Sequence, residues 1–157
     1  MISSEERNTN ISESKIISSR RNLLVKRIRS LTLKEGRNRH GMILLEGTHL
    51  IVEALKTNHL IAEIIATTAW IKENKEIYDS FDGRTLIHEV TESVLKTALT
   101  TKNPDGVAAI YPLNGLPKPS QNPSFVLALD RLQDPGNLGT LFRTALAGEV
   151  ELVLLAS

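Results

Sequence analysis

The sequence predicts an α/β fold in two parts, a larger N-terminal domain and a shorter strand-helix-strand segment. Over residues 16–111, short apolar runs alternate with segments in which apolar residues recur at helical spacing. Such alternation predicts a sheet covered by helices. A proline-rich stretch follows at 112–123, and one further strand, helix and strand pattern occupies 124–157. We therefore expect a disordered polar tail at 1–15, a domain at 16–111, a linker at 112–123 and the start of a second domain at 124–157.

Composition narrows the class of protein. The chain has 157 residues, of which 41% are hydrophobic and 24% charged, as in ordinary globular domains. It has no cysteine, and its four histidines show no metal-ligand spacing, so we expect neither disulfides nor a metal site. No apolar run approaches the roughly 20 residues that span a bilayer, and the start lacks a signal-peptide pattern. We expect a cytoplasmic protein that does not associate with membranes.

The N-terminal part is strongly basic. Residues 1–40 carry ten Lys or Arg against four acids, a net charge of +6, whereas the remainder carries a net charge of −5. From residue 16 onward the apolar residues fall on one side of a predicted basic amphipathic helix. This charge favours polyanion binding or marks a solvated helix face, and the charge alone does not separate the two interpretations. The apolar positions of the helix are Ile16, Ile17, Leu23, Leu24, Ile28 and Leu31.

The following elements are predicted from hydrophobic periodicity and turn residues. Strands are expected at 42–45, 60–66, 86–87 and 106–111, and helices at 70–78 and 92–99. A further helix is expected after Thr48, carrying Leu50, Ile51, Ala54 and Leu55. The linker at 112–123 contains four prolines and no periodicity. Beyond it, the continuous apolar run at 125–129 has the length of a strand covered on both faces. A helix follows, in which apolar residues recur at helical spacing, and then a second buried strand at 150–155. The apolar positions of this helix are Leu138, Leu141, Phe142, Ala145 and Leu146.

The junction between the strand at 125–129 and the next helix concentrates turn and polar residues. In open α/β sheets, ligands collect where the carboxyl end of a strand feeds a helix. We expect Asn137 to cap the helix, since its side chain can accept from amides two or three residues on. Gly136 and Gly139 are expected to permit an unusual backbone angle or a close approach.

Eight positions of this junction resemble motif 1 of the SpoU (TrmH-like) RNA ribose 2′-O-methyltransferases of the SPOUT superfamily. The resemblance implies that Arg143 and Asn137 are catalytic, and that Asp134, Pro135, Gly136 and Gly139 shape the motif. It also implies an S-adenosylmethionine cofactor and a homodimeric full-length protein. The matching positions are Asp134, Pro135, Asn137, Leu138, Gly139, Arg143, Thr144 and Ala145.

In this family, later motifs in a knotted C-terminal segment form the cofactor pocket, and residues 1–157 do not contain them. We therefore expect a chain truncated after motif 1, with the knot missing and no cofactor-binding residue of its own, inactive by itself. A lone strand, helix and strand also buries too little surface to form a core.

Residues 16–111 resemble the family's substrate-binding domain, which has the fold of ribosomal protein L30e. Residues 34–47 and 101–107 carry this resemblance, although position 105 is Asp where the family usually has Gln. The implied partner is RNA, either tRNA or rRNA, and Arg37, Arg39 and Lys102 are the candidates for phosphate contacts. Glu46 is expected to hold a turn. The aromatic residues Trp70, Tyr78 and Tyr111 are expected in the core rather than stacked on bases.

The predicted chemistry is methyl transfer to a ribose 2′-hydroxyl. Because an arginine has a pKa above about 12, Arg143 is a poor general base. We expect it to bind the ribose oxygen or an adjacent phosphate while a phosphate or water takes the proton. The alternatives are a noncatalytic L30e-like RNA-binding module and, last, a nucleotide phosphate loop, since the Gly-Lys-Ser/Thr ending of a P-loop is missing.

Overall fold

The computed structural model describes residues 16–57, 60–81, 83–119 and 121–156. The chain divides into two compact units, unit 1 up to Leu116 and unit 2 from Pro117 onward. The division falls inside the predicted linker at 112–123. The predicted disordered tail at 1–15 lies outside the described residues.

Unit 1 contains a four-stranded mixed sheet in the order β1-β4-β2-β3. Its strands are β1 (Met42–Glu46), β2 (Glu63–Thr67), β3 (Leu86–Val90) and β4 (Val107–Pro112). Strand β4 runs antiparallel to both β1 and β2, whereas β2 and β3 are parallel. The two central strands β2 and β4 are the most buried of the four.

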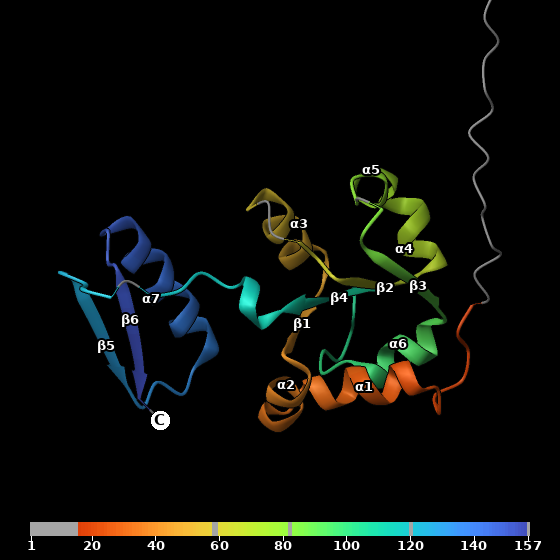
Figure 1. Ribbon diagram of the computed structural model, residues 1–157, viewed down its shortest axis with the longest axis horizontal. Coiled ribbons are helices and arrows are strands. Elements are labelled where there is room, and N and C mark those ends of the chain that lie inside the picture. The colour runs from red at the N-terminus through yellow and green to blue at the C-terminus, as the bar shows by residue number, and fades with distance from the viewer. Residues whose placement is uncertain (1–15, 58–59, 82, 120, 157) are drawn as a thin grey trace, which may run out of the picture. The chain divides into compact units, whose positions relative to one another are not determined.

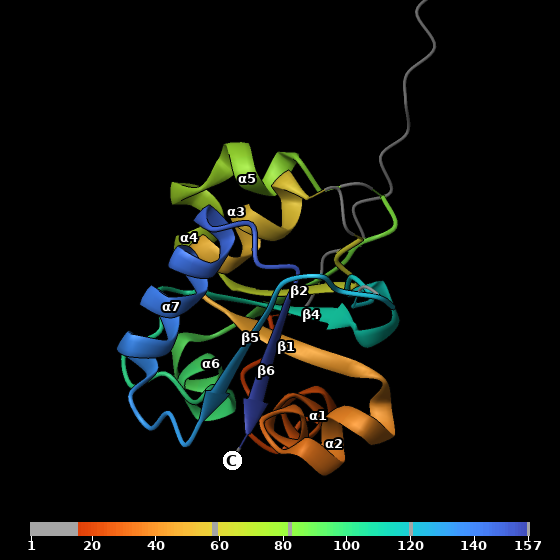
Figure 2. The ribbon, with the colours of Figure 1, turned by 90° about the vertical axis from the view of Figure 1, so that its left-hand side faces the viewer.

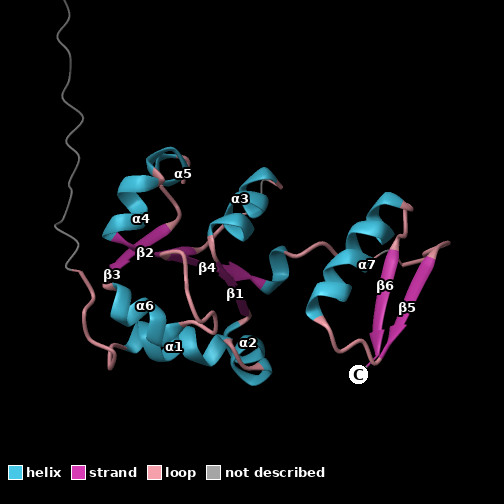
Figure 3. Cartoon of the chain, turned by 180° about the vertical axis from the view of Figure 1, so that it is seen from behind, coloured by secondary structure: helices cyan, strands magenta, loops and turns pink. Residues whose placement is uncertain are grey.

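Helices cover both faces of this sheet (Figures 1 and 3). On one face are α1 (Leu23–Leu31), α2 (Lys34–His40) and α6 (Glu92–Ala98). On the other are α3 (Thr48–Lys56), α4 (Thr68–Glu73) and α5 (Lys75–Asp79). A short 3₁₀ turn, η1 (Leu113–Gly115), follows β4. The predicted α/β class, with helices covering a sheet, is confirmed.

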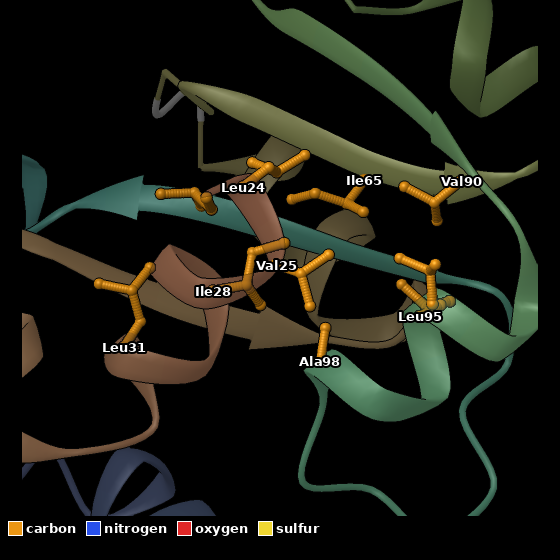
Figure 4. Close-up of a cluster of buried hydrophobic side chains, with 10 residues drawn as sticks. Leu24, Val25, Ile28, Leu31, Ile65, Val90, Leu95 and Ala98 are labelled. Carbon is orange, nitrogen blue, oxygen red and sulfur yellow. The ribbon is translucent and has the colours of Figure 1, made fainter. Parts of the chain in front are cut away.

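Alternation along the strands divides the apolar side chains between two cores, because successive residues of a strand point to opposite faces. Ile64 packs with Ile51 and Trp70 beneath α3 and α4. Its neighbour Ile65 belongs to the opposite core, which the helices α1 and α6 close (Figure 4). The buried members of this second core are Leu24, Val25, Ile28, Leu31, Ile65, Val90, Val94, Leu95, Ala98 and Ile110.

The basic helix begins at Leu23, so the prediction that it starts at Ile16 was wrong. Ile17 instead bridges to β3: its amide donates to the Glu89 carbonyl at 2.9 Å, and its carbonyl accepts from the Thr91 amide at 3.1 Å. Asn22 caps the helix, with its side chain accepting from the Leu24 amide at 2.9 Å. The polar segment at 18–22 therefore separates the β-bridge at Ile17 from helix α1. In the sequence, the apolar residues on both sides of this segment fit one helical period.

Other helix and strand boundaries in unit 1 also differ from the predicted ones. The predicted helix at 70–78 is two helices, broken at Asn74, whose side-chain amide donates to the Trp70 carbonyl at 3.1 Å. Strand β2 begins at Glu63 rather than residue 60, and β3 extends to Val90. Helix α2 was not predicted, because residues 34–40 hold no apolar periodicity. It ends at Gly41, where φ is +62°.

Unit 2 consists of the parallel strands β5 (Val126–Asp130) and β6 (Leu152–Ala156), connected by α7 (Pro135–Ala147). Figure 2 shows the two strands side by side, with α7 along one side of them. The predicted strand, helix and strand are confirmed. The prediction that β5 is covered on both faces was wrong, since Val126, Ala128 and Asp130 are exposed. Of the five apolar residues at helical spacing in α7, only Ala145 is buried.

Candidate functional site

The junction between β5 and α7 is a loop at 131–134 that reverses the chain. Arg131 follows the last strand residue with φ at +51°, an unusual value for a residue with a side chain. Its amide donates to the Ala156 carbonyl at the end of β6, at 3.2 Å. The loop is thereby attached to the neighbouring strand at the carboxyl edge of the sheet.

Asp134, not Asn137, caps α7. Its side chain accepts from the Gly136 amide at 2.8 Å, and its carbonyl accepts from the Leu138 amide at 3.1 Å. Pro135 occupies the first helical position, where a missing N–H costs nothing and the ring presets φ. The predicted cap at Asn137 was wrong because that residue lies inside the first turn, with its side chain exposed. The Asp-Pro pair before an apolar-periodic run is the signal that identifies the true cap.

The two glycines of the motif are helical, and neither has a positive φ. The expected unusual backbone angle was therefore wrong at both. A Cβ at Gly136 would lie 3.2 Å from the capping Asp134 oxygen, so glycine leaves room for the cap. At Gly139 the nearest atom would be Arg143 Nη1 at 3.9 Å, an ordinary contact distance. Gly139 thus leaves the helix surface open beneath the Arg143 side chain.

Arg143 is exposed on α7 and points back toward the start of the helix, as helical side chains do. Its Nη2 donates to Thr140 Oγ1 at 3.2 Å, and that hydroxyl donates to the Gly136 carbonyl at 3.1 Å. A hydroxyl has one proton and two lone pairs, so it can make both contacts at once. The remaining guanidinium N–H groups face solvent and can receive an anionic or hydroxyl ligand.

The two predicted catalytic residues do not lie on the same side of α7. Arg143 lies six positions after Asn137, which corresponds to about 120° around the helix axis and about 9 Å along it. A ligand that contacts both must wrap around the first two turns.

The predicted RNA-binding residues lie in unit 1, at the two ends of β1. Arg37 Nη1 donates to the Leu31 and Thr32 carbonyls at 3.3 and 2.9 Å. These hydrogen bonds cap the C-terminal end of α1. Arg39 is exposed and pairs with Glu35 at 2.7 Å within α2. Lys102 is exposed in the loop after α6, near the other end of β1. The structure therefore separates Lys102 from the two arginines.

The loop that carries Lys102 is held by Glu46, the last residue of β1. Its carboxylate accepts from the amides and hydroxyls of Thr100 and Thr101, at distances between 2.6 and 3.1 Å. Partial burial raises the pKa of Glu46, but the hydrogen bonds from Thr101 and Thr100 together outweigh it and hold the pKa below its ordinary value. The expectation that Glu46 holds a turn is confirmed.

Asp105 completes the same loop. Its Oδ2 accepts from the Thr48 amide at 2.8 Å, at the start of α3. Gly106 follows with φ at +101°, and a Cβ there would lie 2.9 Å from the Trp70 Cβ, so only glycine is accommodated. Asp105 therefore places a carboxylate against an amide in the first turn of a helix, an interaction that a helix N-terminus favours.

A cavity of about 440 Å³ opens beside this loop. Its lining includes Lys96 and Lys102 but also the acids Glu73, Glu92 and Asp105. Trp70 also lines it while being 2% exposed, and its Nε1 donates to Thr48 Oγ1 at 2.8 Å. Trp70 and Tyr111 belong to the core as predicted, whereas Tyr78 is half-buried.

Two findings on the described residues bear on the class of protein. None of the helices in this part of the chain combines the length and apolar character needed to cross a membrane. In the same ranges, no three His, Cys, Asp or Glu side chains are grouped so that they could hold a metal ion.

Residues 22–109 match the family model of the MRM3-like substrate-binding domain. The chain therefore belongs to this family, and the predicted resemblance to SpoU-type RNA methyltransferases is confirmed.

Individual relatives extend the similarity into unit 2. The chain is 38% identical over 144 residues to an uncharacterized tRNA/rRNA methyltransferase of Synechocystis sp., covering 90% of this chain and 52% of the relative. It is 32% identical to the 23S rRNA (guanosine(2553)-2′-O)-methyltransferase RlmP of Bacillus subtilis, covering 90% and 54%. The AdoMet-bound rRNA methyltransferase of Sinorhizobium meliloti superimposes with a TM-score of 0.65 at 31% identity, covering 90% and 54%. The chain spans about half the length of the curated relatives it matches.

Proposed function

We propose that this chain supplies the RNA-binding domain and the first catalytic segment of an S-adenosylmethionine-dependent RNA ribose 2′-O-methyltransferase acting on rRNA or tRNA. The observation that carries the proposal is the β5–α7 junction, where Asp134 and Pro135 start a helix that presents an exposed Arg143. The similarity to a 23S rRNA 2′-O-methyltransferase over 90% of the chain supports the same reaction.

The cofactor would supply the methyl group, but the described residues of α7 do not suit its sulfonium. The sulfonium is a cation, and the charged side chain within α7 is the Arg143 guanidinium, also a cation. Like charges repel, so we assign no residue of α7 to the sulfonium. The guanidinium instead suits the RNA, which offers phosphate oxygens and ribose hydroxyls.

In the proposed mechanism, Arg143 positions the nucleotide rather than moving a proton itself. Its planar fork can bind a phosphate or the 2′-oxygen through two N–H groups while Thr140 holds a third. Fixing the hydroxyl in line with the methyl group removes much of the entropic barrier. The proton leaves to an RNA phosphate or to water. Asp134, as the cap, fixes the start of the helix that carries Arg143.

A noncatalytic RNA-binding module of the L30e type is the second candidate. Unit 1 alone supports it equally, since the family match covers residues 22–109. The β5–α7 junction favours the enzyme, because a module that only binds RNA has no need of this arrangement. We further propose that the whole protein acts in the cytoplasm, away from membranes, as a homodimer.

The test uses the whole protein that contains this segment. Arg143→Ala is expected to reduce methyl transfer to RNA at least about a hundredfold, by the loss of positioning. Calorimetric binding of S-adenosylmethionine should be unchanged, because no residue of α7 holds the sulfonium. Activity is measured as transfer of radiolabelled methyl groups to total tRNA and to rRNA fragments.

The matched control is Arg131→Ala, which removes an exposed guanidinium from the same junction. We expect it to retain most of the activity. Full activity of the Arg143 variant would remove this residue from the site. Lack of transfer by the unaltered protein to any RNA, with the cofactor bound, would favour the noncatalytic module.

A further inference from the structure

The helices α1 and α2 and the segment before them present a concentrated positive charge. Residues 16–40 hold eight Lys or Arg and one acid, Glu35. We define the α1–α2 basic surface by the members of this set whose side chains are exposed: Arg20, Arg21, Lys26, Arg29, Lys34 and Arg39.

Two cations of the segment are used inside the fold and are not part of this surface. Arg27 pairs with Glu63 of β2, whose side chain is 8% exposed and also lies 2.8 Å from His88 Nε2. Arg37 hydrogen-bonds the carbonyls at the end of α1. The first contact holds α1 against the sheet, and the second holds α2 against α1. The helices that carry the exposed cations are therefore fixed in place by contacts within unit 1.

The exposed cations of α1 lie opposite its core face. Lys26 and Arg29 are three residues apart, hence neighbours on the helix surface, while Leu24, Val25, Ile28 and Leu31 point into the core. Within the described ranges, the side chains of Lys26, Arg29 and Lys34 make no salt bridge. Arg39 is paired with Glu35, but this pair is exposed on both sides and costs little to separate.

The other predicted contact, Lys102, lies in a different electrostatic setting. The cavity beside it is lined by Glu73, Glu92 and Asp105 as well as Lys96. A phosphate approaching this loop meets at least as many negative as positive groups. The α1–α2 basic surface, with an excess of positive groups, is therefore expected to attract a polyanion more strongly than the mixed charges around Lys102.

We propose that the phosphate backbone of RNA docks on the α1–α2 basic surface and not on the Lys102 loop. This inference rests on the proposed function, since it names the surface through which the substrate is held. The leading contacts are Lys26, Arg29 and Lys34, three exposed cations on these fixed helices without salt-bridge partners in the described chain. Such contacts position RNA without reading its sequence.

The experiment measures binding of this chain to a fluorescently labelled RNA hairpin with a single-stranded loop, by anisotropy over a series of salt concentrations. The test variant carries Lys26→Ala, Arg29→Ala and Lys34→Ala. Each phosphate contact removed lowers the slope of log affinity against log salt by roughly 0.7 to 0.9. We expect the slope to fall by roughly 2 and the affinity at about 0.1 M salt to fall at least about tenfold.

The matched control removes the same charge from exposed helical positions of α3, α4 and α5: Lys56→Ala, Lys72→Ala and Lys75→Ala. Two of these lysines form exposed ion pairs, whose loss costs little stability. We expect less than about a threefold change in affinity, through net charge alone. Circular dichroism confirms that both variants are folded.

The outcomes separate the inference from the proposed function. Equal slopes for the test variant and the unaltered chain, both binding RNA, would overturn the α1–α2 assignment. A larger slope change for Lys102→Ala than for the test variant would place RNA on the loop instead. Failure of the unaltered chain to bind the hairpin would count against the proposed function itself. Binding to anionic lipid vesicles but not to RNA would overturn both.

Discussion

The two parallel strand pairs of the molecule, β2–β3 and β5–β6, share one hydrogen-bonding pattern and differ in burial. All five residues of β2 are buried, because β4 flanks it on the other side and helices cover both faces. In β5, residues alternate between exposed and half-buried, with one helix packed in its unit. Both pairs have the same parallel hydrogen-bonding pattern, but the burial of their side chains depends on how many strands and helices surround them.

The same difference separates the polar contacts of the two units. In unit 1, Glu63 and Glu46 accept several hydrogen bonds and hold helices and loops in place. In unit 2, Asn137 and Arg143 are exposed, and the contacts around them are local to α7. Glu46 and Glu63 therefore serve the stability of unit 1, whereas Asn137 and Arg143 of α7 are accessible to a ligand.

The largest expected effect compares two leucines near the ends of helices. Leu31 of α1 is 1% exposed, and Leu146 of α7 is 80% exposed. We expect Leu31→Ala to lower the free energy of unfolding by about 2–5 kcal/mol, through lost burial and a cavity. Leu146→Ala should change it by no more than about 0.5 kcal/mol. Urea denaturation followed by circular dichroism measures both, and similar costs would contradict the contrast between the units.

A smaller effect is expected at Glu46. Glu46→Ala leaves the Thr100 and Thr101 amides without their acceptor and should cost about 2 kcal/mol at neutral pH. Because folding lowers the pKa of Glu46, its contribution is fully present above the ordinary value near 4.5 and is lost as pH falls through the lower folded pKa. The difference in unfolding free energy between the two proteins should therefore shrink below about pH 4.5.

Glu53→Ala is the control for this experiment, since Glu53 is exposed and pairs only with Lys56 in the described chain. Its removal should cost no more than about 0.5 kcal/mol. A Glu46 difference that stays constant down to pH 3 would show that the carboxylate charge is not what holds the loop.

The smallest expected effect concerns the stability of the first turn of α7 and compares Asp134 with Asn137. Asp134→Ala removes the cap of α7 and should destabilise its first turn by about 1 kcal/mol. Asn137→Ala should have less effect, because Asn137 is not the cap. Amide hydrogen exchange at the first turn of α7 measures both. Greater loss of protection in the Asn137 variant would show that Asn137, as predicted from the sequence, caps the helix.

The sequence predicted most elements of unit 1 because their apolar periods are long and their ends carry turn residues. The strand at 42–45 and the helix at 92–99 agree with β1 and α6 to within one residue. The start of the basic helix was missed, since Ile16 and Ile17 continue the helical period although Ile17 bridges to β3. Helix α2 was missed because packing against α1, rather than an apolar stripe, stabilises it.

The candidate site was predicted in its location but not in its internal geometry. The turn residues between a strand and a helix identified the junction at 131–136, because the composition of such a turn is local. The choice between Asp134 and Asn137 as cap depends on where the first helical hydrogen bond forms. We predicted Asn137, but the structure has Asp134 as the cap, and Pro135 at the first helical position agrees with that start.

By itself, the sequence determined the α/β class, the order of most elements, the basic N-terminal segment and the motif that carries the family resemblance. These follow from periodicity, charge and short spacings, which are local properties of the chain. Only the tertiary structure decided which cations are available. Arg27 and Arg37 are indistinguishable from Arg29 in sequence, but Glu63 and the carbonyls of α1 lie within reach of the first two once the helices pack. The partner of a charged side chain is often distant in sequence, and only folding brings the two together.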